Sequence, residues 1–226
     1  MSGPSGTATV PPRPPMDVYE AIARRRDVRT EFSGAVVDDA TLHRVLAAAH
    51  RAPSVGLSQP WDFVVVRDPA TLDAVAAHVA EERAAYAAEL PPERAERFAP
   101  VAVEGVRAAR TGVVVTHDQS RGGPQVLGRR TVPDTGLYST CLAIQNLWLA
   151  ATAEGLGVGW VSFFREDVLR GLLAVPDHVR PVAWLCVGPV TGLAEVPDLE
   201  RHGWRRRRPL AAAVHHERFT PTHEEA

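Results

Sequence analysis

The segment GLGVGWVS at residues 155–162 decides the fold class of this chain. The spacing of its glycines is that of a dinucleotide-binding fingerprint, but that fingerprint follows a strand and opens a helix. Here the segment follows an apolar helix expected over 137–154 and opens a strand expected over 158–163. This order excludes a Rossmann domain. It favours an α+β fold in which the glycines let backbone amides approach a flat ligand ring.

Helices and strands are interspersed on both sides of this segment. The helix over 137–154 is expected to be the longest. Because it is apolar over much of its circumference, we expect it to lie centrally or at a subunit interface. Prolines interrupt 90–110, which is left unassigned, and 121–133 is expected to be a loop. The other expected elements are helix 16–25 with Val18, Ile22 and Ala23 on one face, a helix from Asp38 or Asp39 to Pro53, strand 61–66, helix 69–89, strand 112–116, helix 166–173 and strand 182–187.

The composition is that of an ordinary soluble domain. Hydrophobic residues make up 45% and charged residues 23% of the 226 residues, and the net charge of -2 gives no reason to expect nucleic acid or an anionic membrane as partner. No apolar run approaches the roughly 20 residues that span a bilayer. Residues 1–15 lack the apolar core of a secretion signal, so we expect a disordered tail and a cytoplasmic protein. Cys141 and Cys186 are expected to be buried thiols, and the nine histidines show no zinc spacing, so no metal site is expected.

Arginines are dense in RRRDVR at residues 24–29, where the first expected helix ends. Their planar guanidinium groups match the geometry of a phosphate, although a run of this kind alone is more often a solvated helix end. Asp27 stands among these arginines, which should keep its carboxylate ionised unless burial acts in the opposite direction. A carboxylate beside an anion site is a candidate general acid or base.

Two further motifs point to a ligand, each with an ordinary alternative. GWRRRRPL at 203–210 supplies a second set of phosphate donors, or else a solvated basic tail or nucleic-acid patch. APSVGLSQPW at 52–61 joins a helix to a strand, and its hydroxyls and amides either contact a polar ligand or only shape the turn. Ser162 could place a hydroxyl at the edge of a bound ring, although a strand-end serine is the commoner case.

Taken in order, these motifs resemble the FMN-dependent nitroreductase family. Within the family the chain is most similar to the branch that fragments reduced FMN to 5,6-dimethylbenzimidazole, the lower ligand of cobalamin. The resemblance covers 16–219, predicted to be one domain, with 220–226 as a C-terminal tail. It implies a three-layer α/β/α sandwich with a mixed central sheet and a C-terminal arm that extends over the partner subunit. The motifs that carry it are RRDVR at 25–29, APSVGLSQPW at 52–61, YSTCLAIQNLWLAA at 138–151, GLGVGWVS at 155–162 and GWRRRRPL at 203–210.

The resemblance also implies a homodimer with FMN in each of two interface clefts. Arg25, Arg26 and Arg29 match the residues that hold the flavin phosphate and ring. Arg205 and Arg207 match the C-terminal phosphate contacts, and Ser54 matches a serine that reaches the flavin of the partner subunit. The full set of expected flavin contacts is Arg25, Arg26, Asp27, Val28, Arg29, Ser54, Val103, Gly159, Trp160, Val161, Ser162, Arg205 and Arg207.

Asp27 and Ser162 match the two residues tied to catalysis in the flavin-fragmenting branch, and ordinary nitroreductases usually carry serine in place of this aspartate. On this interpretation reduced FMN is the substrate, molecular oxygen cleaves its ring and ribityl chain, and erythrose 4-phosphate is the second product. Electrons would come from NAD(P)H, with a separate flavin reductase as a possible partner. Asp27 could take up protons near the ribityl carbon, and Ser162 could hydrogen-bond the flavin N5.

The chain departs from the family pattern in one region. It has AVEGV at 102–106, where the pattern has a KLEGI-like stretch with a lysine, and Arg110 where the pattern has proline. Three other functions stay open: a nitroreductase or NAD(P)H:flavin oxidoreductase that retains FMN, a paralogue that fragments flavin for another pathway, and a non-catalytic flavin- or nucleotide-binding protein. Nucleic-acid binding through 205–208 is disfavoured by the net charge.

Overall fold

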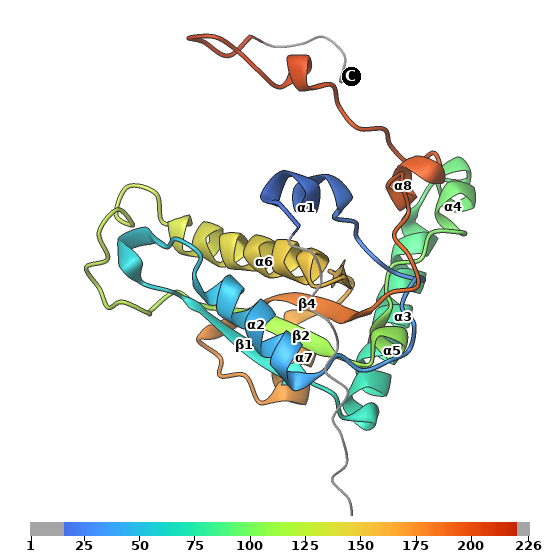
Figure 1. Ribbon diagram of the computed structural model, residues 1–226, viewed down its shortest axis with the longest axis horizontal. Coiled ribbons are helices and arrows are strands. Elements are labelled where there is room, and N and C mark those ends of the chain that lie inside the picture. Colours follow the sequence, from blue (N-terminus) through green and yellow to red (C-terminus); the bar gives the residue numbers. More distant parts are fainter. Residues whose placement is uncertain (1–15, 221–226) are drawn as a thin grey trace, which may run out of the picture.

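A four-stranded antiparallel sheet forms the centre of the computed structural model, which describes residues 16–220 (Figure 1). Its strand order is β1-β2-β4-β3, and all three neighbouring pairs run antiparallel. The prediction of a mixed sheet is wrong for these strands. Parallel pairing is limited to one bridge between Asp27 and Val158, because the chain at Asp27 follows the open edge of β3 for a single residue pair. The strands are β1 (Trp61–Val66), β2 (Gly112–Asp118), β3 (Leu156–Val161) and β4 (Val179–Pro189).

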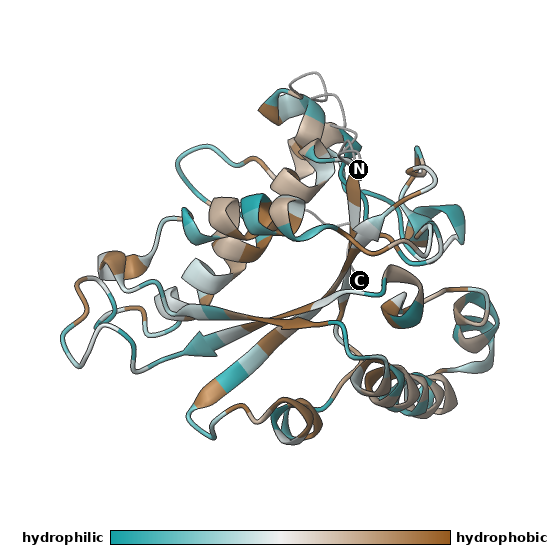
Figure 2. Cartoon of the chain, turned by 60° about the horizontal axis from the view of Figure 1, so that its bottom comes forward, coloured by the Kyte–Doolittle hydropathy of each residue, from teal (hydrophilic) through white to brown (hydrophobic). Residues whose placement is uncertain are grey.

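Helices cover both faces of this sheet, as Figure 2 shows, so the predicted three-layer α/β/α sandwich is confirmed. On one face α2 and α6 pack against the sheet, and on the other face α3, α5 and α7 do. The helices are α1 (Val18–Arg24), α2 (Asp39–His50), η1 (Val55–Leu57), α3 (Pro69–Glu89), α4 (Pro92–Phe98), α5 (Val106–Ala109), α6 (Thr135–Ala153), α7 (Glu166–Leu173), α8 (Asp198–Arg201) and η2 (Leu210–Ala212).

Strand β2 explains why both layers are needed. All seven of its residues are buried, and successive side chains point to opposite faces of the sheet. Val113 and Val115 join the cluster of α2 and α6, whereas Val114 joins the cluster of α3, α5 and α7. A strand that is apolar on both faces must be covered on both, which fixes the order of the layers.

The helices begin where side chains can bond free backbone N–H groups. The carboxylates of Asp17, Asp38 and Asp68 each accept a hydrogen bond of 2.8 Å from the amide three residues later. Asp38, and not Asp39, is therefore the cap of α2. Strand β1 and helices α3 and α7 have the predicted bounds.

The helix α6 is not the longest helix, contrary to the prediction. It has 19 residues, whereas α3 has 21, because α3 runs without interruption from its Asp68 cap to the proline pair that follows. The unassigned stretch 90–110 contains the short helices α4 and α5. Cys186 is buried as predicted, but Cys141 is only half-buried.

Helices α1 and α6 are among those that expose apolar side chains. Val18 and Ile22 of α1 are 57% and 51% exposed, although sequence periodicity places them on one apolar face, and Ala21 is the buried residue of this helix. Tyr138 and Leu142 of α6 are 54% and 46% exposed. Within 16–220, no helix is long and apolar enough to cross a membrane. The segment after α8 runs away from the sheet (Figure 1).

Candidate functional site

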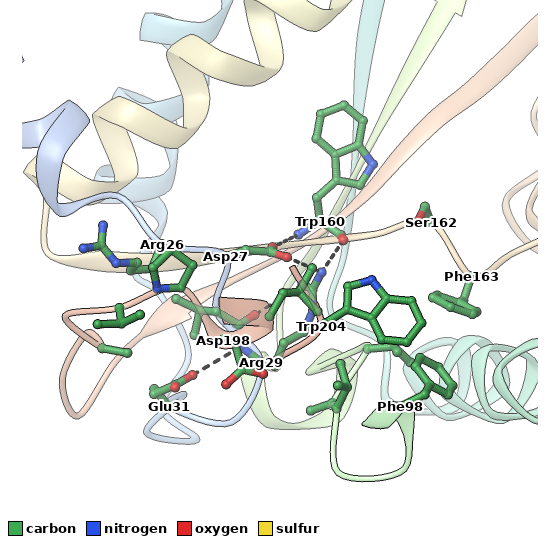
Figure 3. Close-up of a pocket in the computed structure, with 18 of the residues that line it drawn as sticks. Arg26, Asp27, Arg29, Glu31, Phe98, Trp160, Ser162, Phe163, Asp198 and Trp204 are labelled. Carbon is green, nitrogen blue, oxygen red and sulfur yellow. Dashed lines mark hydrogen bonds and ion pairs between the residues drawn. The ribbon is translucent and has the colours of Figure 1, made fainter. Parts of the chain in front are cut away.

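A cavity of about 300 Å³ lies between the chain after α1, the end of β3, and helices α4 and α8 (Figure 3). One wall is polar and contains Asp27, Arg29 and Ser162. The opposite wall is apolar and includes Phe98 and Trp204. The cavity therefore has groups that can transfer protons on one side and, on the other, a surface that suits a flat apolar ligand.

The carboxylate of Asp27 is held from two sides. Its Oδ1 accepts a hydrogen bond of 2.9 Å from the backbone N–H of Trp160, and its Oδ2 accepts one of 2.6 Å from Nη2 of Arg29. The same Nη2 lies 2.6 Å from the backbone oxygen of Trp160 (Figure 3). Asp27, Arg29 and the end of β3 thus form one hydrogen-bonded unit.

Gly159 lets the chain after α1 approach β3. A Cβ atom at this position would overlap the backbone oxygen of Val28 and lie 2.5 Å from Nη1 of Arg29. The backbone N–H of Val28 donates to the Val158 oxygen at 3.0 Å, which keeps the two segments in contact. The space that a side chain would occupy is filled by the backbone of Val28.

Burial raises the pKa of Asp27 above its ordinary value. The positive charge of Arg29, the Trp160 amide and the charge of Arg25 oppose this shift, and they do not cancel it. Burial therefore outweighs the arginine neighbours that the sequence suggested would keep the group ionised. The side chain keeps 45% of its surface exposed, so a ligand in the cavity can reach it. A reachable carboxyl group with a raised pKa can both accept and donate a proton.

The structure brings the two arginine-rich segments together. Burial lowers the pKa of Arg25, and the next largest cause is the positive charge of Arg207. The guanidinium of Arg25 also lies over the ring of Trp148, with its carbon 5.0 Å from the ring centroid. Arg205 is exposed, and its backbone N–H contacts the Leu199 oxygen at 3.5 Å. Arg25 and Arg207 therefore form one positively charged region at the end of α1.

The other predicted contacts divide into two groups. Ser162 directly follows β3 and borders the cavity. Its side chain is exposed and points away from Phe98 and Trp204 (Figure 3), and no hydrogen bond of its hydroxyl occurs within the described part of the chain. Val28 and Val103 are buried residues of the cavity wall. Val161 is buried in the cluster of α3, α5 and α7, so only its backbone could face a ligand in the cavity.

Ser54 lies outside the cavity wall. Its Oγ accepts a hydrogen bond of 3.0 Å from the backbone N–H of Gln59, within the loop that contains η1. In Figure 1 this loop is at the opposite end of the molecule from α4 and α8. Ser54 of the same chain therefore cannot line this cavity.

The sequence did not identify the aromatic wall. The ring centroid of Phe98 lies 6.2 Å from that of Phe163 and 6.0 Å from that of Trp204, and the guanidinium of Arg94 lies 4.4 Å above the Trp204 ring. Tyr86 contacts both phenylalanines edge-on. Only Trp204 belonged to a motif. Tyr86 and Phe163 lay in an expected helix and an expected strand without a functional signal, and Phe98 lay in the unassigned stretch.

Arg110 marks a real departure from the family pattern. It ends α5 with a φ of 57°, in the left-handed region. A proline, whose φ is fixed near about -65°, could not take this conformation. The residue lies outside the cavity wall, so the departure changes the end of α5 and leaves the polar wall as described.

Comparisons with known proteins agree with this geometry. The Nitroreductase family model matches residues 22–189. The chain is 43% identical over 185 residues to 5,6-dimethylbenzimidazole synthase of Rhodospirillum rubrum, covering 82% of this chain and 87% of the relative. It is 36% identical over 190 residues to a protein of the same name from Rhodobacter capsulatus, covering 84% and 91%.

Solved structures share the fold. Iodotyrosine deiodinase bound to FMN and 3-iodo-L-tyrosine superposes with a TM-score of 0.71 at 20% identity, covering 90% of this chain and 100% of that one. A BluB-like flavoprotein from Clostridium difficile gives a TM-score of 0.68 at 20% identity, with the same coverage. At this level of identity the likeness concerns the fold.

Proposed function

The chain belongs to the nitroreductase family, and from this premise we propose that it fragments reduced FMN with molecular oxygen to 5,6-dimethylbenzimidazole and erythrose 4-phosphate, while the pyrimidine part of the ring leaves as a further product. The relatives named for this product, at up to 43% identity, support the reaction class. The observation that carries the proposal within the site is Asp27, a reachable carboxyl group with a raised pKa held against β3.

The residues present fit FMN. Burial lowers the pKa of Arg25, and repulsion by the positive charge of Arg207 lowers it further. A phosphate between them would relieve this repulsion and accept hydrogen bonds from both. The flavin ring would then lie along 159–162, between the polar and aromatic walls of the cavity. Reduced FMN, when bound, supplies both the electrons for oxygen and the bonds that are cleaved.

Asp27 is proposed to move the protons of this reaction. Each of its oxygens accepts one hydrogen bond from the protein, which leaves further lone pairs directed at the cavity. Arg29 and the Trp160 amide fix the carboxylate in place, so little ordering is needed when a substrate arrives. Ser162 is proposed to place its free hydroxyl at the ring edge.

The homodimer is also part of the proposal. Val18, Ile22, Tyr138 and Leu142 form exposed apolar surface on α1 and α6 that a second copy would cover. Such a copy could bring its Ser54 to the flavin, which the same chain cannot do. The C-terminal arm after α8 is proposed to lie over that copy. NAD(P)H is proposed as the electron source, through a separate flavin reductase.

The test is to incubate the purified protein in air with FMN, NAD(P)H and a separate flavin reductase. The flavin absorbance should fall irreversibly, and 5,6-dimethylbenzimidazole should accumulate in step with it. Bleaching no faster than in a no-enzyme control would overturn the proposal. A protein that purifies yellow and reduces a nitroarene over many turnovers, with its flavin intact, would instead be a nitroreductase that retains FMN.

A further inference from the structure

We propose that Arg26 is a positioning residue that holds 192–197 as a wall of the cavity, and that its guanidinium does not bind the flavin phosphate. The inference rests on the proposed function in placing that phosphate at Arg25 and Arg207. The family resemblance gives the adjacent Arg25 and Arg26 the same role in holding the flavin, whereas this inference gives them different roles.

The donors of Arg26 are already used within the chain. Its Nη1 donates to the backbone oxygens of Ala23 and Arg25, both at 2.7 Å, and its Nη2 donates to the backbone oxygen of Glu195. Its Nε is buried and has no partner within the described residues. The buried Nε–H and one N–H of Nη2 are left; because Nε is buried, at most one of these two donors can reach a ligand, whereas a two-pronged contact with phosphate needs two parallel N–H groups. In Figure 3 the side chain points away from Asp27.

Arg25 is the opposite case. Within residues 16–220 its guanidinium makes no hydrogen bond, and it lies over Trp148 close to the positive charge of Arg207. Its donors are therefore available to an anion. The indole N–H of the same Trp148 donates to the backbone oxygen of Arg26 at 3.0 Å, so α6 fixes the backbone from which both side chains diverge.

The segment that Arg26 holds has few other attachments. Before it, Thr191 donates from its backbone N–H to the Glu31 oxygen at 2.9 Å. Between 192 and 196, the bond from Arg26 to Glu195 is the only hydrogen bond to other parts of the described chain. Leu193 and Val196 of this segment line the cavity. Leu193 also packs against the cluster of α3, α5 and α7, so Arg26 supplies the polar attachment of this wall beside that apolar contact.

Arg26 also separates two hollows. A second cavity of about 750 Å³ lies between α1, the end of α6 and 190–195. Arg26, Leu193 and Ala194 line both this hollow and the flavin cavity. Without the Arg26 bonds, the shared wall between the two cavities would no longer be held in place. A flavin in the first cavity would then lose contacts with its ring as well as with its phosphate.

FMN and riboflavin differ only by the phosphate, so their relative affinities test whether Arg25, and not Arg26, binds the phosphate. Dissociation constants for oxidised FMN and riboflavin are measured by quenching of flavin fluorescence with the wild type, Arg26→Gln and Arg25→Gln. Arg25→Gln should lower the preference for FMN by about 10-fold or more, because it removes charged hydrogen bonds to phosphate. Arg26→Gln should weaken both flavins and keep the preference within about threefold of wild type. Arg26→Lys keeps the positive charge but lacks the planar guanidinium, and its affinities for the two flavins should resemble those of Arg26→Gln.

A second measurement needs no flavin. A Glu-specific protease should cleave after Glu195 about fivefold faster or more in Arg26→Gln, because the segment opens more often once a hydrogen bond of about 1 kcal/mol is lost. Cleavage in Arg25→Gln should match the wild type. The proposal is overturned if Arg26→Gln loses the FMN preference as Arg25→Gln does, or if its cleavage rate is unchanged. A wild type that binds neither flavin contradicts the proposed function instead, and the cleavage rates still decide the role of Arg26.

Discussion

The two walls of the cavity are built in different ways. The polar wall uses consecutive residues after α1, from Asp27 to Arg29, hydrogen-bonded to Val158 and Trp160 of β3. The aromatic wall collects Tyr86, Phe98 and Trp204 from α3, α4 and the chain after α8, and holds them by ring contacts. Hydrogen bonds are directional, so they hold the atoms of the polar wall in defined positions for a reaction. Ring contacts define the shape of the aromatic wall and allow its side chains to adjust to a ligand.

This difference predicts where substitutions act. Changes in the polar wall should alter the reaction or the frame that positions it. Changes in the aromatic wall should alter how well a flavin fits and should have modest effects on stability. Four experiments test this contrast, in order of decreasing expected effect.

Asp27→Asn should have the largest effect. It removes the proton-transfer group and keeps the shape of the side chain, so formation of 5,6-dimethylbenzimidazole should fall about 100-fold or more. FMN affinity should change little. Product is measured by chromatography and affinity by flavin titration. Asp73→Asn is the matched control, since Asp73 is an exposed carboxylate of α3 that pairs with Arg107. Activity of Asp27→Asn within a few fold of wild type would contradict the assignment.

Gly159→Ala tests the frame of the polar wall. The added Cβ would overlap the Val28 backbone oxygen, and neither backbone segment can move without breaking the contact between them. We expect a loss of about 1–3 kcal/mol in the free energy of unfolding, measured in urea. Gly171→Ala in α7 is the control, because a Cβ there meets nothing within 4 Å and alanine favours a helix. Equal stability of the two variants would show that the two segments can separate freely.

Phe98→Leu tests the aromatic wall. The side chain is buried and contacts three other rings, so the loss of ring contacts should cost about 1 kcal/mol of unfolding free energy. FMN and riboflavin should both bind more weakly, with their ratio unchanged. Phe219→Leu, at a position that is 77% exposed, should change neither quantity. A selective loss of FMN would mean that this wall contacts the phosphate end.

The raised pKa of Asp27 predicts a small dependence of stability on pH. Folding favours its protonated form, so this contribution to stability is present at low pH and is lost as the pH rises through the folded-state pKa. Asp27→Asn should therefore melt at a slightly higher temperature than the wild type at pH 7, and the difference should vanish near pH 3. Thermal melts across this range measure it. A difference of the opposite sign would mean that Arg29 outweighs burial.

The polar wall could be predicted from the sequence because its parts are local. The arginine run with its aspartate and the glycine-rich strand are each continuous, and the family resemblance placed them at one ligand. The strands and long helices were also readable, since β2 is apolar on both faces and aspartates cap the helices. Bounds differed mainly at strand ends, where pairing continues beyond the apolar run.

The rest depends on contacts between distant segments. Phe98 lies in a stretch that prolines made unreadable, and it becomes part of a wall only when Phe163 and Trp204 meet it. Arg25 and Arg26 are identical in type and adjacent, and only the fold shows that the guanidinium of one is free of hydrogen bonds within 16–220 while three donors of the other bond backbone oxygens. The exposed side of α1 looked like a core face because periodicity does not say what covers it.

The single backbone bridge between Asp27 and Val158 has a consequence for how the family can diverge. Residue 27 is held beside β3 by main-chain atoms, and the neighbouring Val28 amide bonds Val158 whatever side chain residue 27 carries. A serine, which the family resemblance leads us to expect here in ordinary nitroreductases, could stand at the same point and leave this main-chain frame intact. With the role proposed for Asp27, one side-chain change could therefore separate a family member that retains its flavin from one that consumes it, while the architecture stayed the same.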